Sequence, residues 1–522
     1  MNYDLVVRNG KVLDGEGNPW IRADIAIAGG RFVKIGYVEG HGRLEIDAAG
    51  DYVTPGWIDM MDQSGRILPL NGLAENKLRA GITTAIAGEG GAPKPSAELA
   101  EYFTTLENLG ISLNFGTYYG AAQARVEVMG DVSDPCTVEQ MEAMKGHVAE
   151  AMRAGALGIA TALIYPPDCF QTTDDLVKLC EVVAEYKGIY ASHLRDESAD
   201  LLEGIAESIE IGRRSGVQVE IFHFKAAYAP EWGKLVPKAG ASIDAARADG
   251  INIGANMYVY TAGGTGLDVT VPNWVFADGM ETGLTRLRNP VVRDRLKKEV
   301  AAGSLPGWSN LVEACGGWDN IVLANACSEK YDAFRRTSLG EIAKQLGEHP
   351  ADVAWDIVLE AVPNRSTALF IMMSEPDIEM ALRFPWMSIG TDAHADFGAG
   401  KIHPYGLPHP RANGNHPRVI SEYVKARGVL TIEDAIRKMT SWPASRMHLH
   451  DRGAIREGLR ADLTIFNYDK IADVASYDDP TAYPQGIDYV IVNGEVVIDR
   501  GRHTGARPGM VLRGQGFSVG AE

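Results

Sequence analysis

Two histidines stand at the ends of two apolar segments that are close in the sequence. His193 closes the segment GIYASH, and His223 follows the segment VQVEIF. If both segments are neighbouring parallel strands, their carboxyl ends lie side by side and bring the two imidazoles together. Because imidazole nitrogens are zinc ligands, this arrangement predicts a metal site. A single histidine in an apolar strand would more often be a hydrogen-bonded core residue.

A carboxylate follows a third apolar segment, WMSIG. At the same rim, Asp392 could accept a proton from a metal-activated water and pass it to a leaving group. As an isolated aspartate it could equally cap a helix. Lys225, on the same side of its strand as His223, and Arg411, in the later segment HPRANG, are suited to an anionic substrate. Either could instead be a structural ion-pair partner.

Two tyrosines and one further arginine lie close to these segments in the sequence. Tyr165, in IYPP, and Tyr258, in MYVY, are candidates for hydrogen-bonding walls of a pocket. Core packing explains both tyrosines equally well. For Arg195, in HLRDE, we expect a structural ion pair.

The segments that position these residues alternate between strand-like and helical patterns from about residue 55 to residue 392. Such alternation is typical of βαβ units with a parallel sheet, and eight units close a (β/α)8 barrel of the TIM type. The eight strand candidates are WIDMMDQ, GITTAIAG, SLNFGTYYG, ALGIATAL, GIYASHLR, VQVEIFHFK, INIGANMYVY and PWMSIGTDA. A ninth candidate, STALFIMM at 366–373, is one too many, and we interpret it as an accessory strand.

Both ends of the chain have the pattern of short strands rather than of helices. The opening segments DLVVRNG, ADIAIAGGRFVKIG and LEIDAAGDYVTPG are separated by turn residues, and DYVIVNGEVVIDRG at 488–501 repeats their character. We therefore expect a small β-sandwich built from both termini, with residues 1–54 and 451–522 flanking a barrel at 55–450. Two unrelated β-hairpins are the alternative.

A long insertion interrupts the barrel pattern at about 264–365. It is too long for an ordinary loop after a strand, and it carries helical patterns such as PVVRDRLKKEVAA. Because it follows a strand end, we expect this helical insertion over the top face of the barrel, as a lid or specificity element. A peripheral helical decoration is the alternative.

Composition limits the partners and the location of the protein. The formal net charge of -19 over 522 residues argues against nucleic acid or an anionic membrane as a partner. The opening lacks the pattern of a signal peptide, and no apolar run is long enough to span a bilayer. Five widely spaced cysteines do not suggest a disulfide framework. We expect a cytoplasmic protein with a small-molecule substrate, and a homo-oligomer is compatible with the sequence.

The chain resembles the amidohydrolase superfamily, and within it the N-acyl-D-amino-acid deacylases or D-aminoacylases, over almost its whole length. The segments that carry the resemblance are VVRNGKVLDGEGNP, PGWID, AGITTAIAG, GALGIATALIYPP, YASHLRDES, IFHFK, YTAGGTGL, IGTDAHA, HPRANGNHPRVI, AIRKMTSWPA, DRGAIREGLRADLTIF and VIVNGEVV. The resemblance implies zinc-assisted hydrolysis of the amide of N-acyl-D-amino acids. It also implies that His193 and His223 are metal ligands, that Asp392 is catalytic, and that Lys225 and Arg411 hold the substrate carboxylate.

The sequence departs from the family pattern at two strand ends. Where the family has His-x-His after PGWID, this chain has Met61-Asp62-Gln63, and a thioether and an amide are poor zinc ligands. Where the family has Gly-Asn-Cys-Gly, it has Gly88-Glu89-Gly90-Gly91, which lacks the thiolate. Glu89 could supply a carboxylate ligand instead if the glycines form a turn or bulge. The alternatives are a two-histidine site completed by water, or a ligand shell that includes Gln63 and Asp392.

These observations predict a metal-dependent amidohydrolase with one Zn²⁺ per chain, held by His193, His223 and Glu89; another divalent metal would also fit. Asp392 would transfer the proton, and the substrate would carry a carboxylate. A second hypothesis keeps the scaffold but changes the substrate to another amide, a cyclic amide or a lactone. A third is a metal-free, inactive binding protein, which the missing His-x-His and cysteine favour.

Overall fold

The central unit of the computed structural model, which describes residues 2–397 and 406–518, is a parallel barrel. Its strands are β6 (Trp57–Asp62), β7 (Ile82–Ala87), β8 (Asn114–Thr117) with β9 (Tyr119–Gly120), β10 (Gly158–Ala162), β11 (Ile189–His193), β12 (Gln218–Ile221), β13 (Ile253–Met257) and β17 (Met387–Ile389). β6, β7 and β8 pair in parallel, and β9 to β13 and β17 form a second parallel run. A parallel bridge between Asp62 and Ala393 joins β6 to the segment after β17. The eight predicted barrel strands are thereby confirmed.

Helices cover the outside of these strands, which explains why the strands read as nearly continuous apolar runs. Every residue of β6, β10, β11 and β13 is buried. The covering helices begin and end at expected signals: Thr172 caps α5 (Thr173–Glu185), and Gly216 ends α6 (Leu201–Ser215) in a left-handed conformation. Among the helices of the described residues, none has both the length and the apolar character needed to cross a bilayer.

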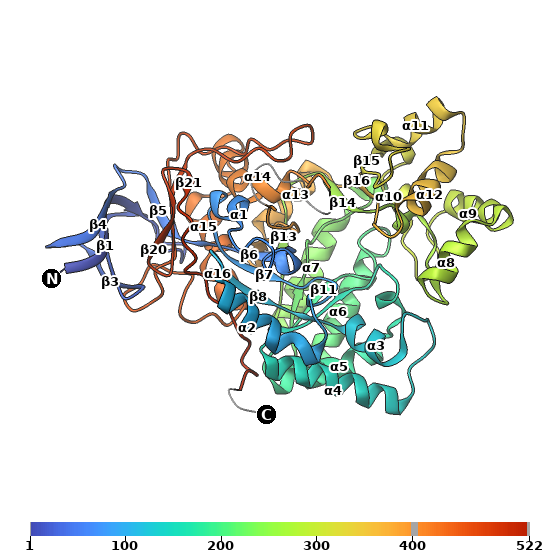
Figure 1. Ribbon diagram of the computed structural model, residues 1–522, viewed down its shortest axis with the longest axis horizontal. Helices are drawn as coiled ribbons and strands as arrows, with labels where there is room; N and C mark the ends of the chain where they lie inside the picture. The colour runs from blue at the N-terminus through green and yellow to red at the C-terminus, as the bar shows by residue number, and fades with distance from the viewer. Residues whose placement is uncertain (1, 398–405, 519–522) are drawn as a thin grey trace.

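The two ends of the chain share one β-rich domain, as predicted. The N-terminal strands β1 (Asn2–Val12) to β5 (Tyr52–Pro55) and the C-terminal strands β18 (Leu463–Phe466) to β21 (Arg502–His503) form one continuous nine-stranded sheet. The junction is an antiparallel pairing of β5 with β18, in which Val53 faces Ile465. Two separate hairpins are excluded. Figure 1 shows this domain on one side of the barrel, with the blue N-terminal strands beside the red C-terminal ones.

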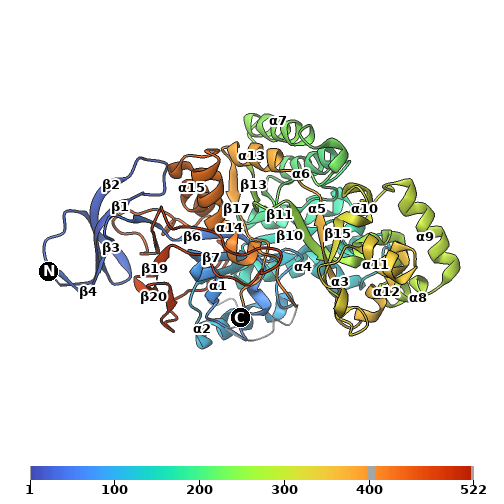
Figure 2. The same ribbon diagram turned by 90° about the horizontal axis from the view of Figure 1, so that it is seen from above.

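The insertion lies at the opposite end of the molecule from the β-rich domain (Figures 1 and 2). It contains the predicted helices, among them α9 (Pro290–Ala302) and α12 (Pro350–Ala361). Beside these helices the insertion has a small sheet that was not expected: β14 (Ala262–Gly266), β16 (Thr367–Ile371) and β15 (Ile321–Asn325) form three antiparallel strands. The segment STALFIMM supplies β16, so its interpretation as an accessory strand is confirmed.

Candidate metal centre and active site

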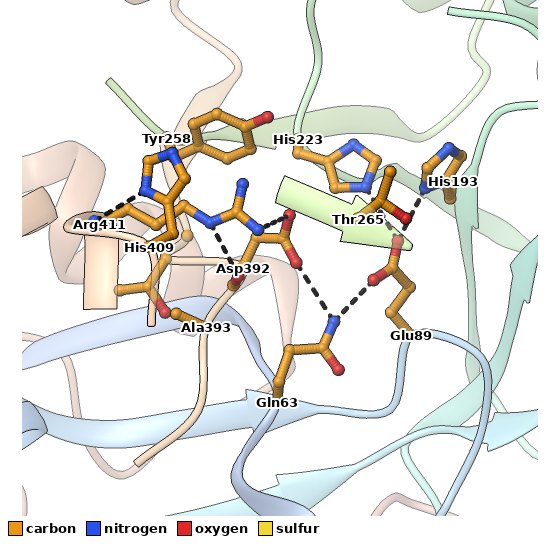
Figure 3. Close-up of polar contacts among 12 residues, drawn as sticks. Gln63, Glu89, His193, His223, Tyr258, Thr265, Asp392, Ala393, His409 and Arg411 are labelled. Atoms are coloured by element: carbon orange, nitrogen blue, oxygen red, sulfur yellow. Dashed lines mark hydrogen bonds and ion pairs between the residues drawn. The ribbon is translucent and has the colours of Figure 1, made fainter. Parts of the chain in front are cut away.

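One carboxylate and two imidazoles converge at the carboxyl end of the barrel strands. Oε1 of Glu89 lies 2.8 Å from Nδ1 of His193 and 2.9 Å from Nε2 of His223. The two imidazole rings, one at the end of β11 and one two residues after β12, are 4.4 Å apart at their centroids. Among the described residues, these three form the group whose ligand atoms lie close enough together to share a metal ion. Figure 3 shows the three side chains facing one another.

The backbone turn that Glu89 needs is present after β7. Gly88 and Gly90 have φ angles of +111° and +68°, a region that residues with a Cβ rarely adopt. A Cβ on Gly88 would also lie 2.7 Å from the carbonyl oxygen of Tyr118, so only glycine fits there. The turn that these two glycines form directs the Glu89 side chain toward the two histidines. The structure thus brings together the three residues that the sequence suggested as ligands.

A second carboxylate, Glu197, contacts the remaining nitrogen of each histidine. Its Oε1 lies 2.9 Å from Nδ1 of His223, and its Oε2 lies 3.4 Å from Nε2 of His193. Oε2 also pairs with Nζ of Lys225 at 2.6 Å. A carboxylate behind a ligating histidine fixes the ring orientation and leaves the other nitrogen free for the metal. Glu197 was not among the residues predicted from the sequence, although its position four residues after His193 in HLRDES was a usable signal.

The electrostatics of this cluster fit a bound cation. Burial raises the pKa of Glu89, but hydrogen bonds and charge from His193 and His223 outweigh it and hold that pKa well below the usual value. Burial and Lys225 lower the pKa of His223, whereas Glu197 and Glu89 raise it to about 9. The two buried carboxylates, Glu89 and Glu197, therefore favour a positive charge at the position of the imidazoles. Two nitrogens and one oxygen that converge on one position are also a donor set that zinc accepts.

Asp392 lies on the other side of Gln63, near Arg411. Its Oδ2 pairs with Nη2 of Arg411 at 2.6 Å, and Nε of Arg411 donates to its backbone oxygen at 2.9 Å. Asp392 has a φ of +47° and His223 a φ of +33°, strained values that are common at functional sites. Burial raises the pKa of Asp392, and the charge of Arg411 opposes this shift. Gln63 donates from Nε2 to both Glu89 and Asp392.

The predicted substrate-binding residues line one cavity of about 1090 Å³ above the barrel. Its wall includes Gln63, Tyr165, Lys225, Tyr258 and Arg411, together with Thr265, Asn325 and Thr367 of the insertion. The insertion therefore contributes directly to the cavity wall. Tyr165 packs edge-on against His193 and contacts the hydroxyl of Thr265 at 2.8 Å.

Two cations of this cavity differ in their availability to a ligand. Lys225 is held by Glu197 and by the backbone oxygen of His223, and its ammonium also contacts Nδ1 of that histidine and lies over the ring of Tyr258 at 5.9 Å. Arg411 is stacked on Tyr258 at 4.4 Å. Within the described residues, its buried Nη1 has no hydrogen-bond partner. Arg411 thus has one donor left for an anion after binding Asp392.

His409 is a further site residue that sequence reasoning missed. Its Nδ1 accepts a hydrogen bond from the backbone nitrogen of Arg411 at 3.0 Å, and its Nε2 lies 2.9 Å from the carbonyl oxygen of Ala262. Burial, with the charge of Arg411, holds the pKa of His409 well below its usual value. A neutral imidazole that accepts at one nitrogen and donates at the other fits both contacts. His409 thereby fixes the start of the Arg411 segment against the insertion.

The residues that replace the family's His-x-His face in different directions. Met61 is 1% exposed within an apolar cluster, and Asp62 pairs with Nζ of Lys77 at 2.9 Å. Lys77 also binds Asp59 at 2.9 Å, and all three charged side chains are fully buried. Of these three replacements, only Gln63 contacts the group formed by Glu89, His193 and His223. The predicted ion pair of Arg195 is likewise present, with Glu207 at 2.8 Å.

Comparison with known proteins identifies the family. Residues 388–498 match a family model described as the amidohydrolase family. A D-aminoacylase of Alcaligenes xylosoxydans xylosoxydans is 30% identical to this chain over 98% of it and 97% of its own length. The chain belongs to the D-aminoacylase branch of the amidohydrolase family. The predicted resemblance is therefore confirmed. As a D-aminoacylase-type amidohydrolase, the chain is a metal-dependent hydrolase of carbon–nitrogen bonds other than peptide bonds.

Two solved structures of this branch superpose on the whole chain. A D-aminoacylase is 27% identical, with a TM-score of 0.81 over 98% of this chain and 100% of its own; its binuclear metal centre is described as activated by one metal and attenuated by a second. An N-acyl-D-glutamate deacylase from Bordetella bronchiseptica is 26% identical, with a TM-score of 0.81 over 98% and 100% of the two chains. That deacylase was solved with zinc and a phosphonate inhibitor that mimics the tetrahedral intermediate.

Proposed function

We propose that the chain hydrolyses the amide bond of N-acyl-D-amino acids, with one zinc ion held by Glu89, His193 and His223. The observation that carries the proposal is the convergence of these three donors: Oε1 of Glu89 lies 2.8 Å from His193 and 2.9 Å from His223, and the three ligand atoms lie within 4.8 Å of one another. The full-length similarity to D-aminoacylase and to two deacylases of acidic N-acyl-D-amino acids supports the substrate class.

In this mechanism, the protein supplies the proton transfer and the charge complementarity. A zinc ion on the three donors would supply a Lewis acid that polarises the scissile carbonyl and lowers the pKa of water. Asp392 receives a proton from the attacking water and delivers it to the leaving nitrogen. Burial raises the pKa of Asp392, which makes its carboxylate a stronger base, while the adjacent Arg411 favours the ionised form that accepts the proton.

The cavity wall provides the contacts for the substrate carboxylate. The buried Nη1 of Arg411, which has no partner among the described residues, is the donor we assign to this carboxylate. Lys225 adds a second positive charge on the side of His223. Tyr165 and Tyr258 form the flanking walls, and the net charge of -19 makes such local cations necessary for attracting an anion.

Hydrolysis rates on matched substrates test this proposal. Metal-free protein reconstituted with zinc is assayed on N-acetyl derivatives of D- and L-amino acids and on a cyclic amide of the same side chain. We expect the highest kcat/KM for the D series, no activity after chelation, and recovery when zinc is returned. A clear preference for the L series or for the cyclic amide would overturn the assignment of the substrate class.

A further inference from the structure

Gln63 joins two carboxylates that come from different barrel strands. Its Nε2 lies 2.6 Å from Oε2 of Glu89 and 3.3 Å from Oδ1 of Asp392 (Figure 3). The other oxygen of Glu89, Oε1, faces His193 and His223. The amide of Gln63 therefore lies on the side of Glu89 that is opposite the two histidines.

The orientation of this amide follows from its surroundings. An NH2 group has two hydrogens and can donate one to each carboxylate, whereas the amide oxygen has none. If the amide were turned over, its oxygen would face two carboxylate oxygens with no proton between them. The backbone of Gln63 is also fixed, since its nitrogen donates to Ala393 at 3.1 Å and its oxygen contacts Nδ1 of His394 at 2.6 Å.

The neighbouring strand-one residues offer no replacement ligand at this position. Met61 packs in an apolar cluster, and its thioether would be a soft ligand for zinc. Asp62 is occupied by Lys77 and by the hydroxyl and backbone nitrogen of Ser64. Gly90, next to Glu89, has no side chain that could supply a ligand. Glu89 and Asp392 supply oxygen donors near this position, and Gln63 already binds both of them.

We propose that the amide of Gln63 stands in the place of a second metal ion, so that this centre binds a single divalent ion. The inference rests on the proposed function, because the first ion is the one held by Glu89, His193 and His223. A second cation between Glu89 and Asp392 would balance their charges; here the neutral amide satisfies both by hydrogen bonds. Among the described residues, the second metal ion that is said to attenuate the D-aminoacylase relative therefore has no site at this position.

Metal stoichiometry of the wild-type protein is the decisive measurement. Metal-free protein is dialysed to equilibrium against increasing zinc, and the bound metal is counted by atomic emission, in parallel with activity. We expect one ion per chain at saturation and a rate that stays constant in a large excess of zinc. Two ions per chain would overturn the inference but leave the proposed function standing. No bound ion would overturn the proposed function itself.

Manganese provides a second test because it prefers oxygen donors. If Gln63 could turn its oxygen toward Glu89 and Asp392, three oxygens would form a set suited to a hard cation. We expect protein that already holds one zinc ion to bind no manganese at equilibrium. Stoichiometric manganese in addition to zinc would overturn the inference.

The variant Gln63→Glu isolates the role of the amide. It has nearly the same shape but replaces the donor with a third carboxylate, so we expect the zinc count to rise from one to two. A count that stays at one would overturn the role given to the amide. The matched control is Gln345→Glu on the surface, where the amide also donates to a carboxylate, Glu341, at 3.2 Å. This control should bind one ion, and circular dichroism should show both variants folded.

Discussion

The two sides of the barrel rim contain buried charge that is balanced in different ways. On the side of β11 and β12, Glu89 and Glu197 enclose two histidines, and the one fixed cation in contact with this group among the described residues is Lys225. On the side of β6, Asp59 and Asp62 share the ammonium of Lys77, which is fully buried. It also donates to Thr391 and to the backbone oxygen of Ala393.

The comparison shows two ways of balancing buried carboxylates: the β11–β12 side carries the proposed metal ligands, whereas the β6 side carries an internal ion pair. Two carboxylates with titratable imidazoles between them can be neutralised by protonated imidazoles or by a bound cation, because an imidazole that loses its proton has a lone pair for a metal. Two carboxylates with a buried lysine are neutralised within the protein. Asp392 follows directly after this second network and receives its position from it, through Thr391 and Ala393.

The largest expected effect is the loss of a metal ligand on the β12 side. The variant His223→Ala should purify without stoichiometric metal and lose about 10⁴-fold or more in kcat/KM, because the Lewis acid contributes several kcal/mol. Atomic emission and steady-state rates check this result. His450→Ala, at an exposed histidine, should change neither quantity. If His223→Ala retained its metal, the assignment of this side as the metal side would be wrong.

The second prediction separates proton transfer from metal binding. Asp392→Asn preserves the shape of the side chain but removes the base, so kcat should fall by about 10²–10⁴-fold while the metal content stays at the wild-type level. Metal analysis and rates are measured on the same preparation. The control Asp294→Asn changes an exposed aspartate of α9 and should leave kcat unchanged. Loss of metal from Asp392→Asn would instead make this residue a ligand.

The third prediction concerns stability on the β6 side. Lys77→Met leaves Asp59 and Asp62 buried without a counter-charge, and the free energy of unfolding should fall by about 3–5 kcal/mol. Urea titrations followed by circular dichroism measure the change. Lys94→Met removes an exposed lysine that pairs with Glu98 at 2.8 Å, and its effect should be less than about 1 kcal/mol. If both variants lost the same free energy of unfolding, the buried network would stabilise the protein no more than an exposed ion pair does.

The smallest expected effect comes from the carboxylate behind the histidines. Glu197→Gln keeps a polar group of the same size but removes the charge, and zinc affinity should fall by about 10–100-fold. Competition with a chromophoric chelator measures the affinity at fixed pH. Glu203→Gln, at an exposed glutamate of α6, is the matched control and should bind zinc like the wild type. An unchanged affinity in Glu197→Gln would mean that the histidines hold their orientation without it.

Sequence patterns predicted the residues whose positions are fixed by the strand period. His193, His223 and Asp392 all come at strand ends, and the carboxyl ends of parallel strands meet at one rim. Glu197 was missed because it lies in a loop after β11, where the period of the strand no longer fixes the direction of a side chain. The bridging role of Gln63 depends on its rotamer, which the sequence does not encode.

The buried ion network and the insertion sheet were missed for a different reason. Asp59 and Lys77 are eighteen positions apart, and isolated charges at such a spacing are ordinarily solvated. The packing of α1 (Glu75–Arg79) against β7 and α14 (Arg411–Arg418) helps to remove them from water. Of the three strands in the insertion sheet, only β16 was predicted, from STALFIMM. β14 and β15 are five residues long and lie among stronger helical patterns, so their short runs carried little periodic signal.

The sheet shared by both chain ends has a consequence for the order of synthesis. Thr54 on β5 contacts Thr464 on β18, a residue 410 positions later in the chain. At roughly 5–20 residues per second, a ribosome needs about 20–80 s to add that stretch. During this interval β5 presents an unpaired edge, to which other nascent chains could add a strand. The sheet of the N-terminal strands can therefore be completed only after almost the whole protein has been synthesised.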